Sequence, residues 1–192
     1  DIWINVPTKA DARYYTELAK LLKSQLAPNI KIYVEYSNEM WNYFFPQYNW
    51  SKTAGVQEEI ASGNTKINAD GESNPDILAM RLFAERTFRI SAAFRSVFGD
   101  AEMMTRVRPV LAWQGGGSYW VENMLKYASS VYTMKPASYY LYGIAGAPYF
   151  NLGAQQTVDG LTTTQVLAAL DAAAANAPVE YRYEHNAYLA KR

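Results

Sequence analysis

Strand-like and helix-like segments alternate along this chain, and their order constrains the fold more than any other feature of the sequence. Short apolar runs that end at turn residues predict strands at 2–6, 30–36, 106–113 and 139–144, the last extended by 147–150. Apolar residues at helical spacing predict helices at 12–22, 75–98, 119–132, 162–175 and 178–192. This order is typical of a parallel sheet with right-handed crossovers, so the sequence predicts an α/β fold.

Helix-end signals and one long connection refine this prediction. Thr8 and Asp11 have a spacing like that of a capping box ahead of the first helix. Pro75 lies near the first turn of the longest predicted helix, and Gly99 follows its last apolar residue. Ahead of Pro75, a long loop at about 42–75 mixes aromatic with small polar residues, and we expect it to hold a short helix around 56–61 and to wall a cleft.

Composition and charge narrow the possible partners. The 192 residues are 49% hydrophobic, enough for one domain covering 1–192 with a sizeable core. Eighteen basic residues balance eighteen acidic ones without a basic cluster, so we expect no nucleic-acid partner. No run approaches the roughly twenty apolar residues of a membrane span, so we expect no membrane partner.

Cysteine is absent, and the single histidine, His185, falls in the last charged helix. We therefore expect neither a metal site nor a cofactor. The chain starts at Asp1 without a Met or a signal-like run, which favours a mature or excised segment. We expect a secreted or periplasmic location.

The end of the second predicted strand holds the most suggestive chemical groups. This strand runs into Asn38 and Glu39, and the carboxyl ends of parallel strands gather at one edge of a sheet. A carboxyl group beside an amide and aromatic rings suits sugar binding, because such rings stack on the apolar faces of sugars. The alternative is an ordinary turn in which Asn38 caps a helix, Glu39 is solvated and the aromatic residues fill the core. The substrate-binding candidates at this edge are Asn5, Tyr36, Trp41, Trp113, Gln114 and Tyr149.

At these residues the chain resembles a known family. The run Glu35-Tyr-Ser-Asn38-Glu39 is similar to the fourth-strand signature of the large glycoside hydrolase clan built on the (β/α)8 barrel, which contains many cellulases, mannanases and β-galactosidases. The resemblance implies that Glu39 is the catalytic general acid/base and that Asn38 binds the sugar 2-hydroxyl. It also implies that Glu35 points into the barrel, where we expect a buried carboxylate to pair with an Arg or Tyr.

The resemblance extends to the other predicted strands. Residues 3–7 resemble the third barrel strand of a bacterial subgroup in that clan, and 106–113 and 139–149 would be the fifth and sixth. The implied fold is a partial (β/α)8 TIM barrel, a half-barrel of about four β/α units with parallel strands. An open α/β sheet without barrel curvature is the alternative fold.

A second catalytic carboxylate is missing from this pattern. The nucleophile of the clan is a Glu on the seventh strand, and a retaining mechanism holds the two carboxyl groups about 5 to 5.5 Å apart. No such strand follows the last predicted helix. Other carboxylates lie on helical patterns and are better interpreted as solvated, namely Glu122, Glu180 and Glu184.

Two functions therefore remain open. The chain is either a glycoside hydrolase-like domain that carries the acid/base of a retaining β-glycosidase, or a non-catalytic carbohydrate-binding or self-associating half-barrel scaffold. In both, the expected ligand is a β-linked oligo- or polysaccharide of the cellulose or β-glucan type. Because four strands of a barrel leave two edges and an inner face uncovered, we also expect a homodimer that completes a barrel-like core.

Overall fold

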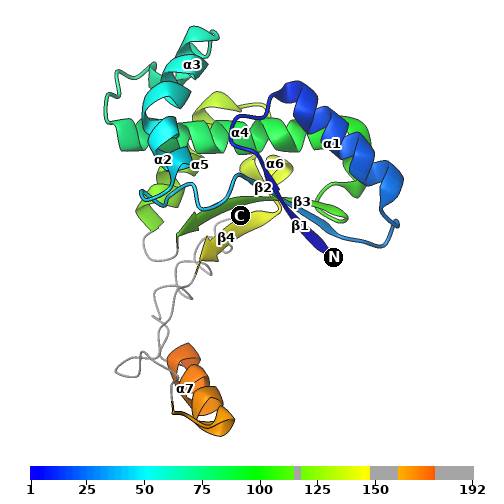
Figure 1. The fold of residues 1–192 in the computed structure, drawn as a ribbon. Helices are drawn as coiled ribbons and strands as arrows, with labels where there is room; N and C mark the ends of the chain where they lie inside the picture. Colours follow the sequence, from blue (N-terminus) through cyan, green and yellow to red (C-terminus); the bar gives the residue numbers. More distant parts are fainter. Residues whose placement is uncertain (115–117, 148–159, 176–192) are drawn as a thin grey trace. The chain divides into compact units, whose positions relative to one another are not determined.

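The computed structural model describes residues 1–114, 118–147 and 160–175 (Figure 1). Contacts within the chain divide it into two compact units. The larger comprises Asp1–Trp113 and Tyr119–Ala145, and the smaller comprises Gln114–Ser118 and Gly146–Arg192. The predicted strand extension at 148–150 and the predicted helix at 178–192, with His185, lie outside the described residues.

The described part of the smaller unit is mainly helix α7 (Thr163–Ala175), which matches the helix predicted at 162–175. Thr162 N donates to Gln165 Oε1 at 2.9 Å, and Gln165 N donates back to Thr162 Oγ1 at 3.4 Å. This reciprocal pair is a capping box, and it explains why the helix begins at this point.

The larger unit is an α/β structure whose four strands form one sheet in the order β1-β2-β3-β4. Strands β1, β2 and β3 are parallel, with Ile4 opposite Val34 and Val34 opposite Pro109. The predicted α/β fold with four parallel strands is confirmed. The strands are β1 (Ile2–Val6), β2 (Ile32–Tyr36), β3 (Val107–Gln114) and β4 (Gly143–Ala147). The α-helices of this unit are α1 (Ala12–Gln25), α2 (Pro46–Trp50), α3 (Val56–Ala61), α4 (Pro75–Phe98), α5 (Ser118–Val131) and α6 (Ala137–Tyr140).

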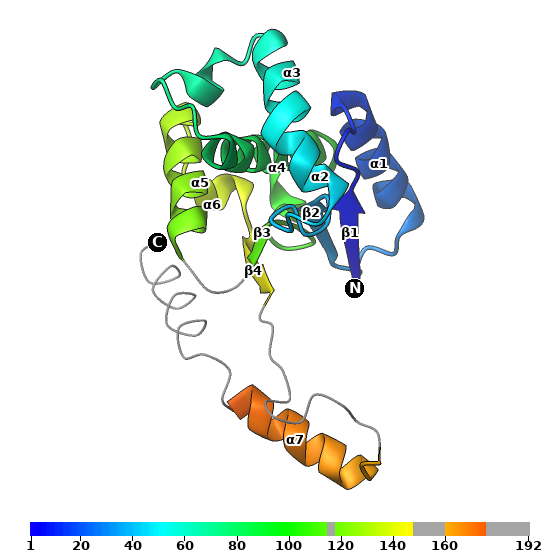
Figure 2. The same ribbon diagram turned by 60° about the vertical axis from the view of Figure 1, so that its left-hand side comes forward.

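The helices α1, α4, α5 and α6 lie on the same side of the sheet (Figures 1 and 2). Because strand side chains alternate between faces, Ile32, Val34 and Tyr36 of β2 point toward these helices, and each is at most 4% exposed. The 24-residue helix α4 packs on α1 and on β2 and supplies much of the core. The opposite face of the sheet carries Trp3 and Tyr33, and the described residues of this unit place no helix over it.

Helix α1 begins where the sequence predicts, but with one capping side chain. Asp11 Oδ1 accepts a hydrogen bond of 2.8 Å from Tyr14 N. Thr8 takes no part in this cap, because its hydroxyl lies 2.7 Å from Ser37 Oγ. The expected pairing of Thr8 with Asp11 is therefore wrong, and Thr8 belongs instead to the end of β2.

The connection at 42–75 contains more helix than the sequence predicts. The expected short helix is present as α3, but α2 and a π-helical turn, η1 (Ser51–Gly55), run directly into it. A Cβ atom at Gly55 would lie 2.9 Å from Trp50 Cζ3, so the indole ring fills the place of a side chain there. The π-turn inserts one residue and so interrupts the helical spacing of apolar residues. For this reason α2 and η1 cannot be recognised as helix from the sequence. Two short 3-10 turns follow in the larger unit, η2 (Thr65–Asn68) and η3 (Asp100–Glu102).

The predicted strand at 139–144 is wrong in its first half. Tyr139 and Tyr140 belong to helix α6, and β4 begins only at Gly143. The ring of Tyr140 stacks on Phe88 of α4 with centroids 4.7 Å apart. Packing on α4 therefore overrides the usual preference of tyrosine for strands.

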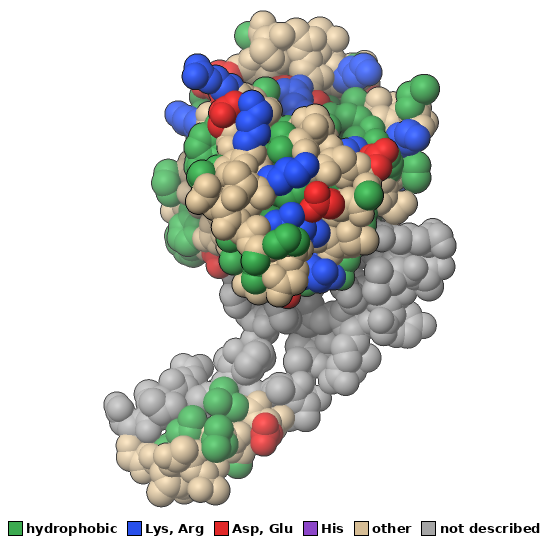
Figure 3. All heavy atoms as spheres, turned by 90° about the vertical axis from the view of Figure 1, so that its right-hand side faces the viewer, with side chains coloured by type: hydrophobic (Ala, Val, Ile, Leu, Met, Phe, Trp, Pro, Cys, Tyr) green, Lys and Arg blue, Asp and Glu red, His purple; other side chains and the backbone are tan. Residues whose placement is uncertain are grey.

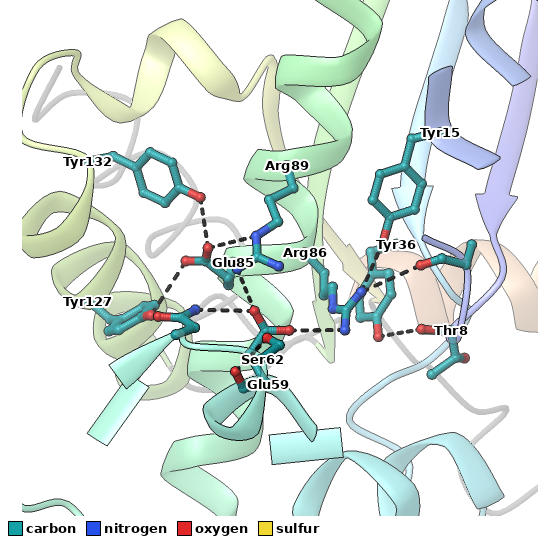
Figure 4. A network of polar contacts seen from close by, with 12 residues as sticks. Thr8, Tyr15, Tyr36, Glu59, Ser62, Glu85, Arg86, Arg89, Tyr127 and Tyr132 are labelled. Carbon is teal, nitrogen blue, oxygen red and sulfur yellow. Dashed lines mark hydrogen bonds and ion pairs between the residues drawn. The ribbon is translucent and has the colours of Figure 1, made fainter. Parts of the chain in front are cut away.

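Buried charges join the long connection to the helical layer (Figure 4). Glu59 of α3 is 2% exposed and forms ion pairs with Arg86, at 3.0 Å, and with Arg89. Glu85 is 4% exposed and accepts hydrogen bonds from Arg89 Nε at 2.9 Å and Tyr132 Oη at 3.0 Å. Because each buried carboxylate meets several donors, the network fixes α3 against α4.

Removing Glu59 should leave the Arg86 guanidinium, whose side chain is 15% exposed, without its carboxylate partner, although Arg89 keeps its ion pair with Glu85. We expect Glu59→Ala to lower the free energy of unfolding by about 3–5 kcal/mol in urea denaturation followed by circular dichroism. Glu58→Ala is the matched control, because Glu58 is an exposed residue of the same helix, and it should change stability by less than about 0.5 kcal/mol. Equal effects of the two substitutions would contradict a special role for the buried pair.

Candidate functional site

The carboxyl end of β2 turns sharply at the residues that the sequence singles out. Ser37 and Glu39 both have left-handed backbone, with φ of +58° and +45°. Such a conformation costs a residue other than glycine about 1–2 kcal/mol. Strained residues of this kind gather at functional sites, where the surrounding structure holds them in place.

Strand β1 and the residues after it hold this turn. Ser37 N donates to Val6 O at 2.7 Å, and Ser37 O accepts a hydrogen bond from Asn5 Nδ2. The Ser37 and Thr8 hydroxyls lie 2.7 Å apart, and Tyr36 Oη donates to Thr8 O at 2.9 Å. Asn5, predicted as a substrate ligand, therefore has one amide hydrogen bond within the turn while its side chain lies at an exposed position of β1.

Glu39 lies at the rim of the sheet with partial exposure. Its Oε2 accepts a 2.9 Å hydrogen bond from Asn42 Nδ2. Asn38 is exposed, and its carbonyl accepts from Gln47 Nε2 at 2.9 Å. The next helix begins only at Pro46, so Asn38 does not cap it. The turn thus presents one amide and one carboxyl group side by side in sequence.

The aromatic candidates divide between this rim and the core. Trp41 is partly exposed, and its ring centroid lies 6.0 Å from that of Trp113. Trp113 is only 7% exposed and also contacts Phe83 of α4. Tyr36 is 4% exposed on the helix side, where burial raises the pKa of its hydroxyl. Trp41 is therefore the aromatic ring most available to a ligand among these three.

Gln114 and Tyr149 are the remaining residues predicted to bind substrate. Gln114 is the exposed last residue of β3. Tyr149 lies outside the described residues.

A second carboxyl group, that of Glu35, lies on the same strand and is 7% exposed. Its Oε2 accepts a 2.8 Å hydrogen bond from Trp3 Nε1. Burial raises the pKa of Glu35 above its usual range, and the negative charge of Glu39 adds to this, while hydrogen bonds from Trp3 and Asn5 act in the opposite direction. The expectation that an Arg or Tyr pairs with Glu35 is wrong, because the indole of Trp3 takes that place.

Trp3 is not among the site residues predicted from the sequence. The signal for it lies in the alternation of β1 and β2: Trp3 pairs with Tyr33 and Asn5 with Glu35, so all four side chains share the face away from the helices. Their proximity follows from the register between the strands, which neither strand reveals alone.

A row of aromatic and cationic side chains crosses the same face, nearer the amino ends of the strands than Glu35. This aromatic row consists of Trp3, Tyr33, Arg108 and Tyr142. Trp3 and Tyr33 stack with centroids 5.3 Å apart and ring planes 9° from parallel. The Arg108 guanidinium lies 5.2 Å from the centroid of Tyr33 and 4.6 Å from that of Tyr142. With Trp3 49% and Tyr142 39% exposed, this row leaves aromatic surface uncovered at both ends.

Other kinds of site have less support within the described residues. These residues include no group of three or more His, Cys, Asp and Glu side chains placed to hold a metal ion. Among the described helices, none is long and apolar enough to span a lipid bilayer. On the face drawn in Figure 3, Lys and Arg side chains stand in separate groups and form no continuous stripe.

Comparisons with protein-family models, curated proteins and solved structures found no match to this chain. The resemblance to the glycoside hydrolase clan therefore depends on the residues of the strand ends alone.

The raised pKa of Glu35 predicts a pH dependence of stability. An unfolded Glu titrates near pH 4.3, about its reference pKa, and a folded pKa above that value means that folding favours the protonated form. The contribution of Glu35 to stability is therefore greatest below the unfolded pKa and is lost as pH rises through the folded pKa. Glu35→Gln keeps an acceptor for Trp3 but does not ionise.

We expect Glu35→Gln to become progressively more stable relative to the wild type as the pH rises above about 4.3, the unfolded pKa, until folded Glu35 has ionised, as measured by urea denaturation. The exposed Glu58→Gln serves as control, and its difference from the wild type should stay flat. If the difference in unfolding free energy between Glu35→Gln and the wild type does not change with pH, or grows in favour of the wild type, the raised pKa of Glu35 is contradicted.

Proposed function

We propose that this chain is a glycoside hydrolase-like domain of the retaining β-glycosidase type, in which Glu39 is the general acid/base. The observation that carries the proposal is the strained turn at the end of β2, which presents Asn38 and Glu39 at the carboxyl edge of a parallel sheet. Ligands of parallel α/β folds bind at this edge. The proposed ligand is a β-linked oligo- or polysaccharide of the cellulose or β-glucan type.

The proposed fold is a half-barrel. The sequential strand order supports it, as does the placement of α1, α4, α5 and α6 on one side of the sheet. Polar groups on the other side, Asn5 and Glu35, suit the inner face of a barrel.

The proposed chemistry follows from the position of each group. Glu39 protonates the glycosidic oxygen as the bond to the leaving sugar breaks. The Asn38 amide binds a sugar hydroxyl, and the Trp41 ring stacks on a sugar face. Glu35 is buried and lies close enough to interact with the charge of Glu39, and both effects raise the pKa of Glu35. A retaining reaction needs a nucleophilic carboxylate as well, and the proposal assigns none within the described residues.

The role of Glu39 is tested by its dependence on the leaving group. We expect Glu39→Gln to lower kcat at least about 100-fold on aryl β-glucosides with a poor leaving group, such as phenol, because general acid catalysis contributes roughly that much. With dinitrophenol, which leaves without protonation, cleavage of the bond to the leaving group should be far less affected. Release of the phenol is followed by absorbance, with the first turnover resolved from later ones.

Glu122→Gln on α5 is the control and should retain the rates of the wild type on both substrates. An equal loss on both substrates with Glu39→Gln would contradict proton donation by Glu39. If the wild type releases no phenol but binds cello-oligosaccharides in calorimetry, and Trp41→Ala weakens that binding, the non-catalytic alternative is correct.

The second candidate function is self-association, and the aromatic row on the sheet favours it. Trp3 and Tyr142 expose aromatic surface on the face that no described helix of the larger unit covers. An exposed aromatic surface of this kind can pair with itself across a twofold axis, which buries the rings of both copies. The occupant that we propose for this face is therefore a second copy of the chain.

Tyr142→Ser should shift the chain from dimer to monomer in size-exclusion chromatography with light scattering at micromolar concentration. Tyr119→Ser is the matched control, because Tyr119 is 56% exposed on helix α5, and it should leave the dimer intact. A wild-type chain that stays monomeric would overturn the proposal.

A further inference from the structure

A separate cavity of about 280 Å³ lies between η2, α4 and α5, on the helical layer. This volume is close to the lower end of the roughly 300–1,000 Å³ that small-molecule sites occupy. Its lining is polar and includes no residue of the strand ends. The lining residues are Lys66, Ala69, Asp70, Arg81, Asn123, Lys126, Tyr127 and Ser130.

The charged residues in the lining of this cavity are mostly cationic. Lys66, Arg81 and Lys126 face one lining carboxylate, that of Asp70. Asp70 is engaged by Arg81 through two hydrogen bonds of 2.7 and 2.6 Å, and this contact lowers the pKa of Asp70. The Glu72 carboxylate, which is not part of the lining, also interacts with Arg81. Two lysines remain in the lining beyond the Arg81–Asp70 pair.

Neither lysine has a strong partner in the described part of the chain. Lys66 forms no ion pair there, and the closest carboxylate oxygen to Lys126 is Glu122 Oε2, 3.8 Å away on the exposed side of α5. Exposed pairs of this kind contribute little free energy. Two ammonium groups on opposite elements, η2 and α5, thus raise the positive potential of a concave surface, which attracts anions.

The walls of the cavity are well fixed. Arg81 Nη1 also donates to Ile67 O at 2.9 Å, which holds η2 against α4. The Arg81 guanidinium lies 5.6 Å from the ring centroid of Tyr127, and Tyr127 is 7% exposed. Burial and the Glu85 carboxylate raise the pKa of Tyr127, so its hydroxyl adds no negative charge. A preformed concave site with a net positive lining results.

From this geometry we propose that the cavity between η2, α4 and α5 binds a small phosphate ester, with Lys66 and Lys126 supplying the charge that recognises the phosphate. The remaining volume has room for a sugar-sized group beside the phosphate, and Asn123 and Ser130 offer polar groups to it. This site is independent of Glu39 and of the proposed hydrolase function.

Calorimetry on the full chain at low ionic strength tests the proposal, with inorganic phosphate, glucose 6-phosphate and glucose as probes. We expect saturable binding of both phosphates and none of glucose. Tighter binding of glucose 6-phosphate would identify the ester as the ligand, and equal binding would identify the phosphate group alone as the recognised chemistry.

The variant Lys66→Ala/Lys126→Ala should weaken binding by more than about tenfold, whereas Lys20→Ala/Lys135→Ala, which removes two exposed lysines elsewhere, should not. Thermal unfolding without ligand should be the same for both variants, which separates lost recognition from lost folding. Absence of phosphate binding by the wild type at millimolar concentration, or equal weakening in the two variants, would overturn the proposal.

Discussion

The register between β1, β2 and β3 is the constraint on which the rest of this structure depends. Val6 lies opposite Tyr36, so both strands end at the same level and Ser37 N reaches Val6 O. The same register sorts the side chains into an apolar set beneath the helices and a polar and aromatic set, with Trp3 and Glu35, on the other face. A slip of one residue would exchange the two sets and remove the core and the strand-end site together.

The elements that the sequence predicts well are those whose signals are local. Strand β1 and helix α4 have apolar patterns closed by Pro7 and by Gly99, and their bounds follow from these residues. The helical residues 46–55 escape prediction because a π-turn interrupts the helical period, and Tyr139 is misassigned because the fold of its segment depends on packing against α4. Local sequence patterns therefore predict most helices and strands, whereas the mispredicted segments take a structure that depends on contacts with distant parts of the chain.

The candidate site, too, has features that local sequence predicts and features that depend on contacts between strands. The sequence places Asn38 and Glu39 at the end of a strand, and the structure agrees. The left-handed backbone of Ser37 and the indole partner of Glu35 are not predictable from β2 alone, because both depend on side chains of β1 and of the turn that follows it. Residues that look independent along the chain, Trp3 and Thr8 among them, thus come together with the end of β2 when β1 pairs with it.

The strained turn is also coupled to the buried ion pairs. Arg86, which pairs with Glu59, reaches toward the Ala10 carbonyl and the Tyr15 hydroxyl at 3.5 Å (Figure 4). The segment from Thr8 to Ala10 therefore lies between this network and Ser37. Two left-handed residues cost about 1–2 kcal/mol each, and each hydrogen bond contributes a net of only about 0.5–1.5 kcal/mol. The hydrogen bonds around Ser37 together offset this strain, so the direction of the Glu39 side chain depends on the segment from Thr8 to Ala10 and on the Glu59–Arg86 ion pair beside it.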